Sequence, residues 1–421
     1  MDRRVVTPVG AARRTAWLAS CALVAACAGC SDRVDRADPV VRTAKSKVQS
    51  ARLDASSVAP SLSGGVSPLP PADLADPVPG CAAPSLAYRG PFDGRTKDAL
   101  ATCADPRSPA RGKSNKCADP RRPLSLLRLR ESVLPIDAAT RARIAQVARK
   151  GRGLGRNPRA FGLVGDSMTI SGDFMTDLGA RRHKAIEIAP ELDSLFALPS
   201  GKSVVDFFRG QKVQRGTGGF EDSFSASRAA KVGVSSPWLT AYDDVDASPI
   251  GKMVRDVDPA YAIVLIGGND AARRLETPEV MAKDFDRDLE GIVAALERRG
   301  VVPILSTLAR HLDQPGVPNC DAPGNPSDHR VAVVTTAISD TVARFACREH
   351  LPLVDVRHAL DDLPHHGLGA DGMHPNVHPK GSAMLNGEGL ACGYNVRNVV
   401  TLQGLARVIA VLMEDGAIDP G

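Results

Sequence analysis

The stretch FGLVGDS at residues 161–167 decides the fold, because a short apolar run ends there in Gly-Asp-Ser. A second stretch, YAIVLIGGND at residues 261–270, has the same design, with an apolar run followed by glycines and a polar pair. Short apolar runs bounded by glycine are typical of strands that are buried on both faces of a sheet. Polar residues therefore follow two predicted strands at their carboxyl ends.

Amphipathic helical patterns alternate with these strands along the chain. The first helix is predicted from Asp137, which can cap the amides of Ala139 and Thr140, to Gly151. Further helices are predicted from Thr277-Pro278 to Gly300, after Ser327 and around residues 402–412. Two more strands are predicted at residues 301–305 and 353–356. This alternation implies a three-layer α/β/α fold around a central, mostly parallel sheet of about five strands. In such sheets, functional sites form outside the carboxyl ends of the strands.

The first 30 residues have the pattern of an export signal peptide. Four arginines up to Arg14 precede an apolar run from Ala16 to Val24, which is too short to remain as a membrane-spanning helix. Val24-Ala25-Ala26-Cys27 resembles the lipobox of bacterial lipoproteins, and Cys30 offers a second site. We expect an exported lipoprotein of the bacterial cell envelope, or a secreted protein if neither cysteine is acylated.

The choice between the two lipidation candidates stays open. Lipobox spacing favours Cys27, whereas cysteine parity favours Cys30, because cleavage there leaves an even six cysteines: Cys81, Cys103, Cys117, Cys320, Cys347 and Cys392. Disulfides are expected in an oxidising compartment, but six cysteines allow 15 pairings, and Cys347 in a helical pattern has the alternative of a buried thiol. Apart from Cys27-Ala28-Gly29-Cys30 in the lipobox-like segment, the chain has no Cys-x-x-Cys pair, so we expect no structural zinc site.

Composition bounds the domains and the partners. The net charge is +5, and residues 1–29 hold three of these charges, so the remainder is nearly balanced and a nucleic-acid partner is not expected. Residues 31–125 are predicted to be a disordered or irregular Pro-rich linker with a Cys-containing lead-in, and residues 126–421 one folded domain. No later segment reaches the ~20 apolar residues that a spanning helix needs, so we expect membrane contact only through the lipid anchor.

The chain offers a nucleophile, a base and an orienting carboxylate. Asp371 and His374 are three positions apart in DGMH, close enough for one turn of chain to hold the carboxylate against the imidazole. Such a base makes a serine hydroxyl nucleophilic at neutral pH, and Ser167 is the candidate. The second glycine of a Gly-x-Ser-x-Gly elbow is replaced by Thr169, which disfavours an α/β-hydrolase.

Taken in order, four blocks of the chain resemble the SGNH, or GDSL-like, hydrolase family. They are Gly165-Asp166-Ser167, the glycine loop around Gly233, Gly267-Gly268-Asn269-Asp270 and Asp371-Gly372-Met373-His374, within about residues 160–415. The resemblance implies a flavodoxin-like SGNH fold in which Ser167 is the nucleophile, His374 the base and Asp371 its partner. It also implies an oxyanion hole formed by Ser167, Gly233 and Asn269, and no cofactor.

Three of these assignments have alternatives. The family's second block often has an asparagine before its glycine, which this chain lacks, and Gly216–Gly219 offers rival glycines that we interpret as a surface loop. Asn269 could be only a helix cap. His378 is a rival histidine, and a metal site is disfavoured because Pro375 and Pro379 prevent one helix from aligning it with His374.

The resulting expectation is a serine esterase that hydrolyses short-chain acyl or carbohydrate O-acetyl esters by two-step acyl transfer. Its partner would be a small-molecule or glycan ester. A lipase or lysophospholipase-like acyl hydrolase is the alternative within the same class. The alternative from another class is a non-catalytic envelope-binding lipoprotein with the same fold. The complete set of Ser167, Asn269, Asp371 and His374 argues against it, because a binding protein does not need all four.

Overall fold

The computed structural model describes residues 115–117, 123–179, 186–214, 220–226, 228–241, 246–273, 278–311 and 329–419. All of them belong to one compact unit that spans residues 68–421. The predicted signal peptide, the Pro-rich tether and the lipidation candidates Cys27 and Cys30 lie outside the described residues. The same holds for the rival glycines at 216–219 and for the predicted helix cap Ser327.

The centre of this unit is a five-stranded sheet in the order β5-β1-β6-β7-β8. Its strands are β1 (Asn157–Gly165), β5 (Ala229–Ala230), β6 (Pro259–Leu265), β7 (Val302–Ser306) and β8 (Leu353–Val354). All four strand pairs are parallel, which confirms the predicted sheet. In the register, Gly165 pairs with Leu265 of β6 and with Ala230 of β5, so the carboxyl ends of these three strands meet at one edge.

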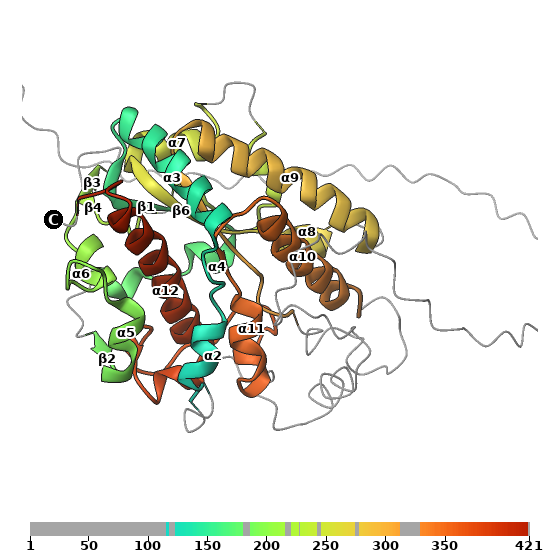
Figure 1. Ribbon diagram of the computed structural model, residues 1–421. Coiled ribbons are helices and arrows are strands. Elements are labelled where there is room, and N and C mark those ends of the chain that lie inside the picture. The colour runs from blue at the N-terminus through green and yellow to red at the C-terminus, as the bar shows by residue number, and fades with distance from the viewer. Residues whose placement is uncertain are drawn as a thin grey trace, which may run out of the picture. The chain divides into compact units, whose positions relative to one another are not determined.

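Helices cover both faces of the sheet, as Figure 1 shows for α9 and α10 on one side and α12 on the other. Side chains alternate along β1, so Phe161 and Leu163 join one apolar core while Ala160 and Val164 join the other. The first core includes residues of α3 (Ala138–Gly153) and α12 (Gly393–Glu414), and the second includes residues of α7 (Pro249–Val257), α9 (Pro278–Arg298) and α10 (His329–Arg348). The three-layer α/β/α prediction is confirmed.

Shorter elements surround these layers. They are the helices α2 (Leu126–Glu131), α4 (Ser167–Ile170), α5 (Asp193–Phe196), α6 (Val204–Phe208), α8 (Gly268–Arg273) and α11 (Val356–Asp361), the strand pairs β2 (Glu187–Ile188) with β9 (Met384–Leu385) and β3 (Val213–Gln214) with β4 (Phe220–Glu221), and the 3₁₀ helices η2 (Thr176–Leu178), η4 (Pro190–Leu192), η5 (Ser236–Leu239), η6 (Pro364–Gly367) and η7 (Gly389–Ala391). Most of them lie in connections between the main strands and helices.

Helix caps explain where several predicted elements begin and end. Asp137 caps α3 as predicted, since its Oδ1 accepts a 2.7 Å hydrogen bond from the amide of Thr140. The strand predicted at 353–356 is too long by two residues, because Asp355 accepts from the amide of His358 and starts α11 instead. An aspartate that can cap a following turn ends the strand before it.

Helix α12 is the most apolar long helix of the described region. It has a mean hydropathy of 1.4 over an 18-residue window, so that by length and composition alone it could cross a membrane. However, 78% of that window is buried inside the protein. A helix that is apolar all round is expected at the centre of a large core, and α12 packs between the sheet and helices α3, α5, α6 and α11.

A disulfide joins two parts of the chain that are far apart in sequence. Cys117 in the lead-in is bonded to Cys392, the residue before α12, and these are two of the six cysteines expected to pair. Cys347 in α10 is also disulfide-bonded, so its interpretation as a buried free thiol is wrong. Helical placement could not reveal this, because sequence spacing does not report which sulfur atoms meet.

Candidate active site

The Gly-Asp-Ser turn lies where β1 ends and α4 begins. Gly165 has no room for a side chain, since a Cβ there would collide with the carbonyl oxygen of Leu265 and the side chain of Thr169. Asp166 then caps α4 by accepting a 3.0 Å hydrogen bond at Oδ1 from the amide of Met168. These two constraints make Ser167 the first residue of α4, and its side chain is only partly buried.

The second part of the site is the loop that carries Asp371 and His374. One carboxylate oxygen of Asp371 accepts hydrogen bonds from the amides of Met373 at 3.0 Å and His374 at 2.9 Å, which closes a tight turn. Gly372 in that turn has a φ of +66°, a left-handed conformation that glycine adopts without strain. The other oxygen, Oδ2, is 2.6 Å from His374 Nδ1.

The two parts meet at the imidazole of His374. Its Nε2 is 2.8 Å from Ser167 Oγ, across 207 positions of sequence. When Nδ1 carries the proton and donates a hydrogen bond to Asp371, Nε2 is left as an acceptor for a hydrogen bond from the serine hydroxyl. The three residues proposed as catalytic from the sequence are therefore brought together in one continuous hydrogen-bond chain.

The charges in this chain hold one another in place. Partial burial raises the pKa of Asp371, but the hydrogen bonds from the His374 ring and from the amides of Met373 and His374 outweigh it and lower the pKa to about 2. The hydrogen bond to Asp371 raises the pKa of His374 above its ordinary value, against an opposing effect of burial. Asp371 thus stays ionised at neutral pH and stabilises the protonated form of the imidazole.

Gly233 and Asn269 lie in the segments that follow the two strands that flank β1, Gly233 in a loop and Asn269 at the start of α8. Gly233 comes three residues after β5 and has a φ of +74°, a backbone conformation that explains why glycine stands there. Asn269 is the second residue of α8, after β6, so it lies inside the first helical turn and not before it. Both segments therefore emerge at the same edge of the sheet as Ser167.

Hydrogen bonds between η5 and α8 connect these two segments. The amide of Ser236 donates to both carboxylate oxygens of Asp270, at 3.1 and 3.0 Å, and its hydroxyl is 2.7 Å from Oδ1. Ser236 is three residues beyond Gly233, and Asp270 directly follows Asn269. This buried contact holds the Gly233 loop and the start of α8 in a fixed relation to each other.

His378 belongs to the fold of the same loop and not to the chain of catalytic candidates. Its side chain is buried, Nδ1 accepts a 3.3 Å hydrogen bond from the amide of Lys380, and Nε2 lies 3.4 Å from Glu388. These contacts give the rival histidine a structural role in the loop that follows His374. In the part of the chain that the structure describes, no group of three or more His, Cys, Asp or Glu side chains is arranged to hold a metal ion.

Arg397 is a component of the site that the sequence analysis missed. It is fully buried in α12, donates to the carbonyl of Met168 at 2.6 Å and to Thr169 Oγ1 at 3.4 Å, and lies 3.6 Å from the ring centroid of Phe174. Burial lowers its pKa to about 10, so it remains a cation at neutral pH. An arginine within the apolar pattern of α12 is the signal that could have identified it, although Arg407 shares that pattern.

His311 was also missed. It follows β7, is buried, and burial together with the nearby charge of His374 lowers its pKa to about 4. The imidazole is therefore neutral at physiological pH. A single histidine after a strand carries no pattern by which sequence alone could assign it to this edge.

The lead-in supports the loop that carries His374. The carbonyl of Asn115 accepts from the amide of Val377 at 3.0 Å, and its side chain donates to the carbonyl of Pro375 at 3.1 Å. The amide of Cys117 donates to the carbonyl of Val377 at 2.9 Å, beside the Cys117–Cys392 disulfide. Residues 115–117 thus run along the chain directly after His374 and are covalently tied to the start of α12.

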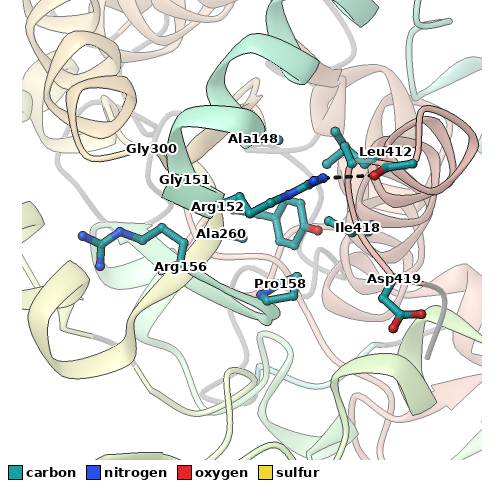
Figure 2. Close-up of a pocket in the computed structure, with 13 residues that line it drawn as sticks. Ala148, Gly151, Arg152, Arg156, Pro158, Ala260, Gly300, Leu412, Ile418 and Asp419 are labelled. Atoms are coloured by element: carbon teal, nitrogen blue, oxygen red, sulfur yellow. Dashed lines mark hydrogen bonds between the residues drawn. The ribbon is translucent and has the colours of Figure 1, made fainter. Parts of the chain in front are cut away.

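A cavity of about 570 Å³ lies at the opposite edge of the sheet, far from this chemistry. It is lined by residues around the amino ends of β1 and β6, among them Pro158 and Ala260 (Figure 2). The dashed hydrogen bond in Figure 2 joins Arg152 to the carbonyl of Gly416, and Arg156 donates to the carbonyl of Arg299. This cavity contains no nucleophile paired with a base, so it is not the candidate active site.

Comparison with known proteins agrees with the fold and with the motifs. Residues 203–378 match the model of the GDSL-like lipase/acylhydrolase family. This match supports an SGNH/GDSL hydrolase, the family that the motifs predicted. The matched range includes Gly233, Asn269, Asp371 and His374, whereas Ser167 lies before it and is brought to them by β1. No curated protein matched the chain.

Removing the disulfide tests whether the lead-in holds the loop that carries His374. We expect a variant with both Cys117→Ser and Cys392→Ser to lose about 2–5 kcal/mol of unfolding free energy in denaturant titrations. Because residues 115–117 lie against residues 375–377, it should also lose turnover under conditions where it is fully folded.

The matched control is Asp137→Ala, which removes the cap of α3 on another part of the domain and should cost about 1 kcal/mol without a change in turnover. If the double variant keeps wild-type stability and turnover, residues 115–117 do not support the loop.

Proposed function

We propose that this protein is a serine esterase that hydrolyses carboxylic esters by acyl transfer through Ser167. The observation that carries the proposal is the continuous chain from Asp371 to His374 to Ser167, with contacts of 2.6 and 2.8 Å. Its family supports ester hydrolysis in general. The nucleophile, the base and the base's partner are this chain's own residues, so no cofactor enters the proposed reaction.

In the first step, Ser167 Oγ attacks the ester carbonyl carbon while His374 Nε2 takes the hydroxyl proton. The imidazolium then gives that proton to the departing alcohol, and the acyl group remains on Ser167. Water, deprotonated by the same nitrogen, attacks the acyl-enzyme and releases the carboxylic acid. Asp371 keeps the ring oriented and stabilises its protonated form throughout, in keeping with the raised pKa of His374.

The negative charge of the tetrahedral intermediate needs fixed donors. The backbone amide of Ser167 is in the first turn of α4, where amides have no partner within the helix, so it is available to an oxyanion. We assign the other two donors to the amide of Gly233 and the side chain of Asn269. Their positions in the segments after the strands flanking β1 and the Ser236–Asp270 contact between those segments support this assignment.

For the substrate, we prefer a short-chain acyl ester or a carbohydrate O-acetyl ester over a phospholipid. The polar surroundings of Ser167, with buried Asp166 and His311 at the same edge, support a small polar ester more than a long alkyl chain. Burial of a long acyl chain would instead need a continuous apolar groove at this edge.

We also propose that the enzyme is exported and anchored to the bacterial envelope through an acylated Cys27 or Cys30. The basic and apolar pattern of residues 1–30 supports this, and the tether that follows would display the catalytic domain. Mass spectrometry of the mature N-terminus tests it, since an acylated cysteine at either position is expected. A mature N-terminus without lipid would make the protein a secreted enzyme.

A fluorophosphonate probe tests the nucleophile directly. The probe should label the purified protein, and Ser167→Ala should abolish labelling, because the phosphonate bonds only to an activated hydroxyl. Thr169→Ser is a matched control in which the neighbouring hydroxyl is kept and labelling should persist. Absence of labelling in the wild type, or labelling that survives Ser167→Ala, contradicts the proposed function.

The oxyanion assignment predicts a separation of activity from stability. Asn269→Ala should lower the turnover of nitrophenyl esters by ~10² to 10³, the usual loss for one donor of an oxyanion hole, and leave the melting temperature nearly unchanged. Turnover and melting temperature are measured on the same preparation. Full specific activity with a large drop in melting temperature would instead make Asn269 a structural residue of α8.

A further inference from the structure

Two buried polar side chains beside Ser167 have atoms without a hydrogen-bond partner. Asp166 Oδ2 accepts no hydrogen bond, and neither ring nitrogen of His311 is paired. The two side chains are 0% and 5% exposed. Unpaired polar atoms at this depth are costly for a folded protein, so their presence together at a candidate active site needs an explanation.

Gly268 brings these two groups to the same small space. A Cβ built on Gly268 would lie 3.3 Å from Asp166 Oδ2, 3.3 Å from His311 Nε2 and 3.2 Å from His311 Cε1. The carboxylate oxygen and the ring nitrogen therefore both lie 3.3 Å from one point, which the side chain of any residue other than glycine would occupy. Asp166 is directly bonded in sequence to Ser167, and Gly268 to Asn269.

The charge states of the two groups are complementary to a hydroxyl. Burial raises the pKa of Asp166 to about 6, although the hydrogen bond from Met168 and the charge of Arg397 act to lower it. The carboxylate is therefore mostly ionised at neutral pH. Burial lowers the pKa of His311 to about 4, so its ring is neutral. A neutral imidazole with its proton on Nε2 donates one hydrogen bond, and the carboxylate accepts one.

We propose that Asp166 Oδ2 and His311 Nε2 form a subsite that binds a free hydroxyl group of the substrate next to the ester that Ser167 attacks. The hydroxyl oxygen accepts from His311, and its hydrogen is donated to Asp166. This inference rests on the proposed esterase function and narrows its substrate to esters that carry a hydroxyl close to the acyl group, such as a partly acylated polyol or sugar.

The shared chemistry is a hydroxyl near the ester, and it can belong to the alcohol or to the acyl part. Two matched pairs of esters separate these sources. The first pair is 2,3-dihydroxypropyl acetate against propyl acetate, and the second is propyl 2-hydroxypropanoate against propyl propanoate. The purified wild-type protein should prefer the hydroxylated member of one pair by about 10- to 100-fold in kcat/KM, the range for a hydrogen bond to a charged group. The pair that shows the preference identifies the source.

His311→Leu removes the donor while filling a similar volume. The preference ratio should fall towards one, because the loss is larger on the hydroxylated ester, and the melting temperature should stay the same or rise since two unpaired nitrogens are removed. His311→Gln, which keeps an N–H donor, should restore part of the ratio. His358→Leu is the matched control, because Nε2 of His358 is also buried without a hydrogen bond but that residue lies in α11, and its ratio should equal that of the wild type.

Three results overturn the subsite. The first is an equal kcat/KM for both members of both pairs in the wild type. The second is an equal loss of kcat/KM on all four esters in His311→Leu. The third is a preference ratio in His311→Gln that is no higher than in His311→Leu. If the protein still labels with a fluorophosphonate in any of these cases, the proposed function stands and only the subsite fails. If it neither labels nor hydrolyses any ester, both fail together.

Discussion

The carboxylate of Asp371 is the group on which the rest of the site depends, because its two oxygens serve different purposes. Oδ1 accepts from two backbone amides and folds the loop, and Oδ2 holds the ring of His374. The same side chain thus shapes the backbone that carries His374 and favours the tautomer of His374 with its proton on Nδ1. A spacing of three residues is what allows one short loop to supply both, since a longer separation would need a second element to position the carboxylate.

Balanced charge around Ser167, the proposed nucleophile, is the second constraint. Asp166, Arg397 and the Asp371–His374 pair lie close enough for their charges to influence one another, and two of them are almost fully buried. Arg397 lies against the ring of Phe174 and donates to the backbone of α4, so its charge is distributed over several partners and not paired with a single carboxylate. A buried cation without such partners would be strongly destabilising, which explains why these contacts surround the turn that presents Ser167.

The fold and the central candidates could be predicted because they depend on local patterns. Apolar runs that end in glycine locate β1 and β6, and the order of the blocks predicts that Ser167, Asp371 and His374 meet. The partners that come from distant segments could not be predicted. Arg397, His311 and the strand-like contact of residues 115–117 depend on which helix or loop packs against the sheet edge, and no periodicity reports that. Likewise the end of β8 depended on a competing cap at Asp355.

The central claim is that Asp371 makes His374 a stronger base for Ser167, and the titration of His374 tests it most directly. Nuclear magnetic resonance of histidine-labelled protein, with the His374 signal assigned by its loss in His374→Ala, measures the pKa of that ring. Because the hydrogen bond to Asp371 favours the protonated ring, the account predicts a pKa above the ordinary value of about 6.5 in the wild type and a fall in Asp371→Asn. A pKa at or below 6.5, or one that Asp371→Asn leaves unchanged, would contradict it.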